Sequence, residues 1–590
     1  MKPAIFGYPA LGRDDVKKLL VYLKDYRKET ILGPLFKLLE ASFELFVPLV
    51  IAAIIDTGIQ NGDMGFIARM CLVLVALGVV GLVCSITAQY FAAKAAVGFV
   101  KKLRHALFQH IQSLSYTELD TLGASTMITR MTSDMNQVQA GLNLTLRLLL
   151  RSPFVVFGAM VMAFTIDWKA ALVFVAAIPL LCIVVFGIML ASIPLYRKVQ
   201  ARLDRVTGVT RENLTGVRVI RAFCKEEEET REFQARNQEL TDVQKFVGRI
   251  SALMNPVTYI IINLAVVLLI WTGALRVEEG ILTQGMVVAL YNYMSQILAE
   301  LIKMANLIIN ITRAVACGNR ISAVFDLSSS QQKAGGPPPQ RKEEAPAVEF
   351  RGVSLRYQGA GDNSLENISF TAGRGETIGI IGGTGSGKTS LVNLIPRFYD
   401  AAQGEVLVDG VNVRDYPLEE LRGSIGVVPQ KAELFQGTIR ENIRWGKPGA
   451  SDGEIWAALE AAQAKEIVNG KESGLGFAVE QGGRNLSGGQ RQRLTIARAL
   501  VRRPRILILD DSASALDFAT DAALRRSLRL LNYHPTVFVV SQRAASLQHA
   551  DKIIVLEEGR AVGIGTHSEL METCQVYREI YSSQFKKEEE

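Results

Sequence analysis

Four long stretches without a charged residue constrain this chain more than any other feature. A bilayer core of about 30 Å is crossed by roughly 20 helical residues, so an apolar stretch of that length predicts a membrane span. The four stretches lie at residues 70–93, 170–196, 250–275 and 280–299, and they contain 24, 27, 26 and 20 residues. Two further runs, 31–59 and 140–166, are apolar but carry a few charges, and both are long enough to cross. We therefore expect six membrane-spanning helices.

The composition agrees with a membrane protein that also has a large soluble part. The 590 residues have a mean hydropathy of +0.20 and a charged fraction of 21%, which excludes a disordered or fibrous chain. The net charge of +7 is small for this length, so a nucleic-acid partner is not expected. The six cysteines show no CxxC or Cys/His spacing, so neither a disulfide framework nor a zinc site is predicted.

Positive charge is concentrated on one side of the predicted spans. The N-terminal segment and residues 94–130 and 197–249 are rich in Lys and Arg, whereas the intervening turns are short and poor in them. The positive-inside rule then predicts a multi-pass protein of a cell (inner or cytoplasmic) membrane with both termini in the cytoplasm. The two basic connections have a helical pattern, so we expect the spans to continue through them far into the cytoplasm.

Two segments flank the predicted six-helix region, which we place at 30–325. Val16, Leu19, Leu20 and Leu23 form an apolar stripe among charges, which predicts an interfacial helix within residues 1–29 rather than a signal peptide. At the other end, residues 326–346 are rich in Pro, Gly, Ser and charge and are typical of a linker. Beyond the linker, short apolar runs at 377–381, 506–509 and 536–540 alternate with helical patterns. These runs predict the buried strands of an α/β domain over 347–590.

Residues 382–389, GGTGSGKT, satisfy the phosphate-loop pattern G-x-x-x-x-G-K-[ST]. The loop follows the strand-like ETIGII and precedes the helical SLVNLIPRF, which is the context that the pattern requires. Its glycines allow backbone N–H groups to surround phosphate oxygens at a helix N-terminus. Lys388 would reach the β- and γ-phosphates, and the Thr389 hydroxyl would ligate Mg²⁺.

Two further motifs follow the phosphate loop. RILILD at 505–510 is an apolar run ending in the carboxylate of Asp510, as expected of a Walker B strand. LSGGQRQR occupies 486–493, about 100 residues after the phosphate loop. With these motifs the chain resembles the ATP-binding cassette (ABC) family, and specifically an exporter half-transporter with six spans and one cassette. The resemblance extends over about residues 15–582.

The resemblance implies ATP and Mg²⁺ as cofactors and a dimer in which the signature of one chain caps the ATP held by the other. It implies that Tyr357 stacks on adenine, that Thr389, Gln430 and Asp510 hold Mg²⁺, and that Asp517 belongs to the D-loop. It also places two cytoplasmic coupling helices near 116–122 and 215–223. The residues implied in nucleotide binding are Tyr357, Gly382, Gly383, Thr384, Gly385, Ser386, Gly387, Lys388, Thr389, Ser390, Gln430, Ser487, Gly488, Gly489, Gln490 and Asp517.

Two positions depart from the family pattern. Members that hydrolyse ATP well carry Glu after the Walker B Asp and His at the switch, where this chain has Asp511 and Gln542. A carboxylate withdrawn by about 1 Å from the attacking water can cost on the order of 10²-fold in rate. An amide cannot carry the charge or proton of an imidazole. Together with Lys388, these two residues are the candidate catalytic set, and they predict a slow ATP site. In this respect the chain resembles the asymmetric heterodimeric exporters of the family, and the resemblance implies a heterodimer whose other chain supplies Glu and His. The alternative is a homodimer with a weak Asp base.

Ionisable residues in the spans are candidates for substrate contact, because charge inside a membrane is costly. Lys37, Glu40 and Glu44 lie in the first predicted span, and Glu300 begins a polar face of the last one that continues through Lys303, Asn306 and Asn310. Lys37 and Glu40 are spaced to pair on one helix face. With Tyr259, Tyr291 and Tyr293, a cavity lined by such residues would suit amphipathic or hydrophobic compounds. Structural ion pairs explain the same charges equally well.

These observations predict an α-helical six-span domain with long cytoplasmic helical extensions, followed by an α/β P-loop ATPase domain. The predicted function is ATP-driven export of an amphipathic or hydrophobic substrate by alternating access, multidrug export included, although lipid and peptide substrates remain open. A nucleotide-binding regulatory or channel-type subunit is the alternative class.

Overall fold

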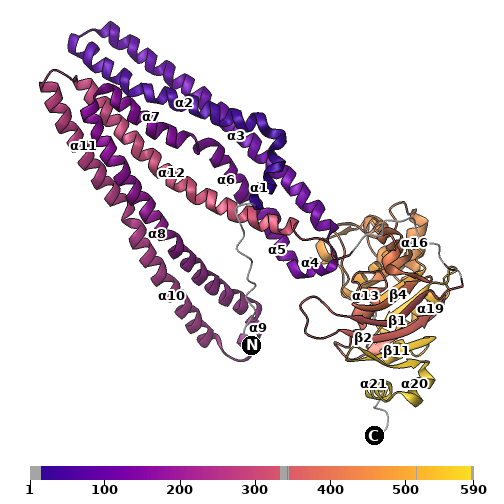
Figure 1. Cartoon of the computed structure of the whole chain (residues 1–590). Coiled ribbons are helices and arrows are strands. Elements are labelled where there is room, and N and C mark those ends of the chain that lie inside the picture. The colour runs from indigo at the N-terminus through magenta and orange to yellow at the C-terminus, as the bar shows by residue number, and fades with distance from the viewer. Residues whose placement is uncertain (1–14, 332–341, 343, 513–514, 586–590) are drawn as a thin grey trace. The chain divides into compact units, whose positions relative to one another are not determined.

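Long helices fill the first half of the chain, and a mixed α/β fold fills the second (Figure 1). The computed structural model describes residues 15–331, 342, 344–512 and 515–585. The first 14 residues of the expected interfacial helix and residues 332–341 and 343 of the expected linker lie outside this range. The chain divides into a helical unit, residues 1–112 and 125–327, and an α/β unit, residues 113–124 and 328–590.

The helical unit consists of long helices joined by short turns. Asp167 begins one of these helices by accepting hydrogen bonds from the backbone N–H groups of Lys169 and Ala170, and Thr283 begins another through the N–H of Met286. The helices are α1 (Asp15–Leu19), α2 (Arg27–Ala53), α3 (Met64–Ser113), α5 (Ala124–Thr129), α6 (Met135–Leu148), α7 (Arg151–Ile166), α8 (Trp168–Thr215), α9 (Val217–Ala222), α10 (Glu226–Ala252), α11 (Met254–Glu278) and α12 (Gln284–Phe325).

Six segments among the described residues are long and apolar enough to cross a membrane, which confirms the predicted number of spans. The 48 residues of α8 give a helix about 70 Å long, more than twice a bilayer core. The predicted continuation of the spans into long helical extensions is therefore confirmed. The six segments are Lys17–Ile59, Met64–Ser113, Ala124–Ile166, Trp168–Thr215, Glu226–Glu278 and Gln284–Phe325.

A six-stranded sheet with the order β12-β11-β3-β10-β9-β6 forms the centre of the α/β unit. β3 (Thr377–Gly382), β10 (Thr536–Val540) and β9 (Ile506–Asp510) are parallel neighbours and nearly fully buried, so the three predicted strands are confirmed. Val537 and Val539 pack into one hydrophobic cluster and Phe538 and Val540 into another, so both faces of the sheet are covered.

The remaining elements surround this sheet. A second, antiparallel sheet has the order β2-β1-β4-β5. The other strands are β1 (Val348–Leu355), β2 (Leu365–Ala372), β4 (Gln403–Val408), β5 (Val411–Asn412), β6 (Ile425–Val428), β7 (Gly437–Thr438), β8 (Ala478–Val479), β11 (Lys552–Glu557) and β12 (Arg560–Gly565). The helices of the unit are α4 (Tyr116–Leu122), α13 (Lys388–Leu394), α14 (Leu418–Ser424), α15 (Ile439–Arg444), α16 (Asp452–Ala461), α17 (Lys465–Asn469), α18 (Gly488–Leu500), α19 (Phe518–Arg529), α20 (His567–Thr573) and α21 (Gln575–Phe585).

Both segments expected to be coupling helices form short helices, α4 and α9. α4 belongs to the α/β unit by its contacts, although the sequence analysis assigned residues 116–122 to the membrane domain. The domain boundaries given above stay predictions.

Candidate nucleotide site

The loop between β3 and α13 has the backbone of a phosphate-binding loop. Gly387 has φ +95°, and a Cβ there would lie 2.8 Å from the carbonyl oxygen of Ser364. A Cβ on Gly382 would lie 2.1 Å from the carbonyl oxygen of Leu556. Only glycine fits at these two positions. The loop leads directly into the N-terminus of α13, where backbone N–H groups favour an anion.

Lys388 is the first residue of α13, and its side chain folds back over the loop. Its Nζ donates to the carbonyl oxygens of Gly382 and Gly383 at 3.0 and 2.6 Å. Burial lowers the pKa of Lys388, while Asp511 and Asp510 act in the opposite direction. The Nζ also donates to the Ser386 hydroxyl at 3.4 Å, so all three of these partners belong to the loop, and phosphate oxygens could replace them.

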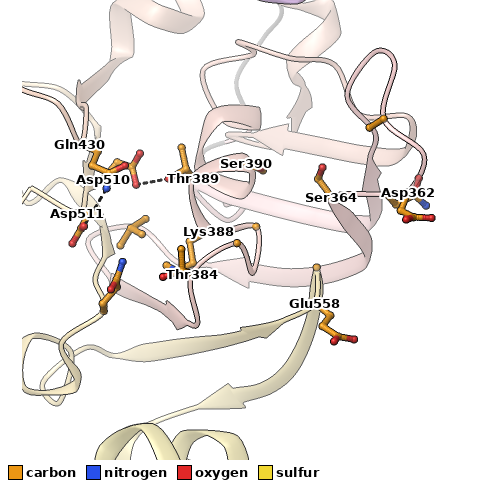
Figure 2. A pocket seen from close by; sticks show the side chains of 17 residues that line it. Asp362, Ser364, Thr384, Lys388, Thr389, Ser390, Gln430, Asp510, Asp511 and Glu558 are labelled. Carbon is orange, nitrogen blue, oxygen red and sulfur yellow. Dashed lines mark hydrogen bonds between the residues drawn. The ribbon is translucent and has the colours of Figure 1, made fainter. Parts of the chain in front are cut away.

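Thr389 and Asp510 come together across the pocket, as Figure 2 shows. The Thr389 hydroxyl donates to Oδ1 of Asp510 at 3.0 Å. Burial is the main reason why the pKa of Asp510 is raised, and the neighbouring Asp511 adds to it. A hydroxyl and a buried carboxylate fit Mg²⁺, which prefers oxygen ligands, and its charge would offset the cost of burying the carboxylate.

Asp511 directly follows β9 and adopts φ +45°, a left-handed conformation that costs energy in a residue with a Cβ. Its backbone N–H donates to the carbonyl oxygen of Val540 at 3.0 Å. The Nε2 of Gln430 donates to its Oδ2 at 3.4 Å (Figure 2). Burial raises the pKa of Asp511, and Lys388 opposes the shift.

Gln542 lies just after β10, on the loop formed by residues 541–544. The loop is tied on one side by Arg543, which donates to the carbonyl oxygen of Leu516 at 3.4 Å and lies 5.0 Å from the ring of Phe518. Ser541 is buried and its hydroxyl accepts from the N–H of Arg543 at 3.0 Å.

A pocket of about 590 Å³ unites most of the predicted residues. It also contains residues that were not predicted as site residues. They come from the segment between β1 and β2, from the turn between β11 and β12 (Figure 2) and, in the case of Val540, from the end of β10. These carry no motif, so no sequence signal singled them out. The predicted residues that line the pocket are Thr384, Gly385, Gly387, Lys388, Thr389, Ser390, Gln430, Asp510, Asp511 and Gln542, and the missed ones are Ala360, Asp362, Asn363, Ser364, Val540, Glu558 and Gly559.

Tyr357 does not line this pocket but lies beside it. Its hydroxyl is 2.9 Å from the Ser390 hydroxyl, and burial raises its pKa. Its ring meets that of Tyr399 edge to face, with the centroids 5.0 Å apart. Gly382, Gly383 and Ser386 also stay outside the lining, since they form the base of the loop under Lys388.

The signature residues are not part of this pocket. Ser487 caps α18 by accepting from the N–H of Gln490, whose side chain in turn accepts from the N–H of Ser487. Gly488 and Gly489 form the first turn of that helix and present its N-terminus. Asp517 likewise caps α19 through the N–H of Thr520, and these hydrogen bonds lower its pKa.

Helix α4 packs on the rest of the α/β unit through Phe398 and Tyr399. Tyr116 lies 4.7 Å from the ring of Phe398, and Tyr399 donates from its hydroxyl to Asp120 at 2.5 Å. The backbone N–H of Ser330 donates to Glu118 at 3.1 Å. The predicted coupling segment is therefore in contact with the nucleotide-binding unit.

The helical unit contains a second cluster of candidate residues. The expected pair of Lys37 and Glu40 is present at 2.5 Å. Arg151 joins three helices, since it contacts Glu44 of α2 at 2.6 Å and Glu300 of α12 at 2.5 Å. Arg151 is one of the few charges in the predicted span 140–166 and was not predicted as a site residue, although charge within a span is itself a signal.

The three tyrosines expected in a cavity do not share one environment. Tyr293 is fully buried and its hydroxyl donates to the carbonyl oxygen of Leu45 at 2.6 Å, whereas Tyr259 and Tyr291 are exposed. Lys303 contacts Glu300 at 2.9 Å, and Asn310 donates to the carbonyl oxygen of Asn306. The hydroxyl of Tyr293 therefore holds two helices together and is not directed at a substrate cavity.

Six spans joined to an α/β domain with a phosphate loop, a Walker B carboxylate and a signature helix define an ATP-driven membrane transporter. Comparisons with known proteins agree. The sequence profile of the ABC transporter transmembrane region matches residues 30–301, and that of the ABC transporter ATPase, described as "ABC transporter", matches 365–514.

The full-length relatives point the same way. An uncharacterized ABC transporter ATP-binding protein of Mycobacterium bovis is 38% identical over 95% of this chain and 97% of its own length. A Bacillus subtilis (strain 168) protein, provisionally named a multidrug export ATP-binding/permease protein, is 31% identical over 96% of this chain and 99% of its own. The chain belongs to the ABC transporter family, as an exporter-type half-transporter with one ATPase domain.

A solved structure has the same fold. A bacterial Atm1-family ABC exporter with ATP bound superposes with a TM-score of 0.79 at 22% identity, covering 96% of this chain and 99% of that one. The chain is thus a multi-pass membrane protein with an ATPase domain, and half-transporters of this family work as dimers in a lipid bilayer.

Proposed function

We propose that this chain is one half of a heterodimeric exporter and that its own ATP site hydrolyses ATP slowly. The single observation that carries the proposal is Asp511, which stands where efficient members of the family have Glu, next to an otherwise complete phosphate site. Its Oδ2 lies within 3.4 Å of Gln430 Nε2, and the adjoining switch position holds Gln542. A shorter carboxylate held by an amide is poorly placed to orient an attacking water.

The rest of the site supports tight nucleotide binding. Lys388 and the N–H groups of residues 382–390 would hold the phosphates, and Tyr357 would lie against the adenine. Thr389, Asp510 and Gln430 would hold Mg²⁺, which when bound neutralises charge on the phosphates. Ser487, Gly488, Gly489 and Gln490 at the start of α18, with Asp517, would complete the site of the partner chain.

The partner is proposed to be a different ABC half-transporter chain that carries Glu and His. ATP would close the two ATPase domains, helices α4 and α9 would transmit the closure, and hydrolysis at the partner's site would reset the transporter. A homodimer with a weak base is the second candidate, and a nucleotide-binding regulatory or channel-type subunit is the third. ATP-dependent accumulation of a dye in inverted vesicles separates transport from gating.

The substrate is proposed to be an amphipathic or hydrophobic compound. The similarity to a relative provisionally named for multidrug export supports this class. Glu44 and Lys303 also support it, because both side chains are half exposed while their partners Arg151 and Glu300 are buried. The proposed location is a cell membrane with both termini in the cytoplasm, on the basis of the charge asymmetry of the loops.

The test is Mg-ATP hydrolysis by the full chain purified alone in lipid nanodiscs, with the oligomeric mass measured on the same sample. We expect tight ATP binding with little turnover. Asp511→Glu should raise turnover by roughly 10- to 100-fold, and the further change Gln542→His should raise it again. Turnover of several ATP per second by the unsubstituted homodimer would overturn the proposal, since Asp511 and Gln542 would then suffice.

A matched control is Asp452→Glu, which makes the same change in α16. Asp452 is exposed and pairs with Arg440 at 2.9 Å, away from the residues that line the nucleotide pocket. This variant should leave turnover at the low level of the unsubstituted chain. A rise equal to that of Asp511→Glu would show that the gain has nothing to do with the attacking water.

A further inference from the structure

The C-terminal helix α21 contacts the loop of residues 541–544, which we call the switch loop, through the side chain of Gln584. Its Nε2 donates to the backbone carbonyl oxygen of Gln542 at 2.7 Å, and its Oε1 accepts from the backbone N–H of Ala544 at 2.8 Å. A carboxamide places a donor and an acceptor side by side, so it can pair with both backbone groups at once. Gln584 thus contacts the backbone on both sides of Arg543.

Helix α21 is itself held firmly against the unit. Tyr577, two turns before Gln584, is fully buried, and its hydroxyl lies 2.8 Å from Nδ1 of His567. Tyr581, one turn before, accepts from Nε2 of Gln548 at 2.9 Å. Residues 577, 581 and 584 therefore lie on one face of the helix, and this face is attached at three successive turns.

Other contacts hold the residues on either side of Gln542. The N–H of Ser541 donates to the carbonyl oxygen of Ile380 at 3.1 Å, and the N–H of Ser546 donates to the carbonyl oxygen of Arg543 at 3.1 Å. Arg543 ties the switch loop to the D-loop side through Leu516 and Phe518, and Ala544 is buried in the hydrophobic cluster that Ile580 of α21 also contacts. The side chain of Gln542 is exposed and lines the nucleotide pocket. Its direction consequently depends on how its own backbone is held.

We propose that Gln584 is a positioning residue for ATP recognition, which acts by fixing the backbone from which Gln542 reaches the γ-phosphate. This inference rests on the proposed nucleotide site, and it assigns Gln542, at the switch position, to the γ-phosphate of ATP. Without the two hydrogen bonds from Gln584, the loop can rotate its peptide groups and the Gln542 amide no longer points into the pocket. The affinity for ATP, which has a γ-phosphate, should therefore fall, and the affinity for ADP, which has none, should stay the same.

The test compares the dissociation constants of ATP·Mg and ADP·Mg, measured with the full chain in lipid nanodiscs. Gln584→Met removes both hydrogen bonds at nearly the same volume and should lower the preference for ATP over ADP by about three- to tenfold. Gln575→Met, the same change at a residue of α21 that pairs with Glu579, should leave the preference unchanged. If Gln584→Met does not fold, Gln584→Glu replaces it, since its carboxylate cannot donate to the Gln542 carbonyl.

A double-mutant cycle separates positioning from a structural role. In a Gln542→Ala background, Gln584→Met should have no further effect on the preference for ATP over ADP. Lys388→Arg should still lower this preference in the same background, which shows that the assay can still detect a loss. An equal loss in both backgrounds, or no loss in either, overturns the inference. If Gln542→Ala alone changes nothing, the proposed role of Gln542 fails instead, so the two failures are distinguishable.

Discussion

The hydroxyl of Tyr399 donates a hydrogen bond to a carboxylate oxygen of Asp120 at 2.5 Å, and this contact joins helix α4 to the nucleotide-binding unit. The ring of Tyr399 meets the ring of Tyr357, whose hydroxyl lies 2.9 Å from Ser390 in the first turn after the phosphate loop. A continuous set of contacts therefore connects the predicted coupling helix with the phosphate loop.

Replacing Tyr399 by Phe should loosen α4 without weakening ATP binding. The lost hydrogen bond to a carboxylate is worth about 1 kcal/mol at this partly exposed site, so amide exchange within residues 116–122 should accelerate about fivefold. Hydrogen–deuterium exchange of the full chain measures this effect. Tyr577→Phe removes a tyrosine hydroxyl elsewhere and should leave α4 unchanged. Equal exchange in α4 for the unsubstituted chain and the Tyr399→Phe variant would show that the contact does not hold the helix.

Burial of Asp510 makes Mg²⁺ binding sensitive to pH. Because its pKa is raised, the folded chain binds this proton more tightly than the unfolded chain does. Without Mg²⁺ the group therefore destabilises the fold at neutral pH, and the destabilisation is relieved as the pH falls through the raised pKa. Mg²⁺ needs the ionised form, so the affinity for ATP·Mg should fall as the pH falls through this raised pKa. Asp510→Asn should bind more weakly but with a smaller pH slope. The same slope in both proteins would contradict the assignment, since the titration of ATP itself is common to both.

Removing the Lys388 ammonium should abolish tight nucleotide binding. Lys388→Met keeps the length of the buried stem, so the domain should fold, but the dissociation constant for ATP should rise about 100-fold or more. Fluorescence titration with a labelled ATP analogue measures the change. Lys465→Met, at an exposed lysine that pairs with Glu460, is the matched control and should bind ATP normally. Binding within threefold of normal by Lys388→Met would remove Lys388 from the phosphate site.

Glu300→Gln should destabilise the helical unit. Arg151 is only 7% exposed and Glu300 only 4%, so the substitution leaves a buried guanidinium with Glu44 as its remaining acidic partner. The expected loss of unfolding free energy is about 3 kcal/mol. Thermal unfolding in one detergent measures it, with Glu279→Gln, at an exposed residue, as the control. The double variant Arg151→Gln/Glu300→Gln should recover part of the lost unfolding free energy, because it removes the unpaired charge. A double variant less stable than Glu300→Gln alone would contradict a paired role of the two residues.

The elements that sequence reasoning predicted best are those in which a local pattern and its chemistry coincide. The spans follow from apolar length alone, because a helix of about 20 apolar residues is stable in a bilayer whatever its neighbours are. The strand ending in Asp510 and the loop ending in Lys388 carry their own signals. For the same reason the departure at Asp511 was visible without any structure.

The residues that were missed depend on partners far away in the chain. The role of Arg151 follows from its ion pairs with Glu44 and Glu300, which are 107 and 149 residues away in the chain. Gln584 resembles any polar residue near a helix end until α21 is packed beside residues 542–544. Glu558 and Asp362 line the pocket only because separate turns meet there.

The sequence by itself determined that this chain crosses a membrane, folds an ATPase domain and carries two atypical residues at its nucleotide site. Each of these properties is local, since it depends on the length of a run or the identity of neighbouring residues. The tertiary structure decided which groups meet. β3, β10 and β9 are adjacent and parallel, so the phosphate loop, Gln542 and Asp510 share one edge of the sheet, although more than 120 residues separate Gly382 from Asp510 in the chain. Only packing brings such distant side chains within hydrogen-bonding distance.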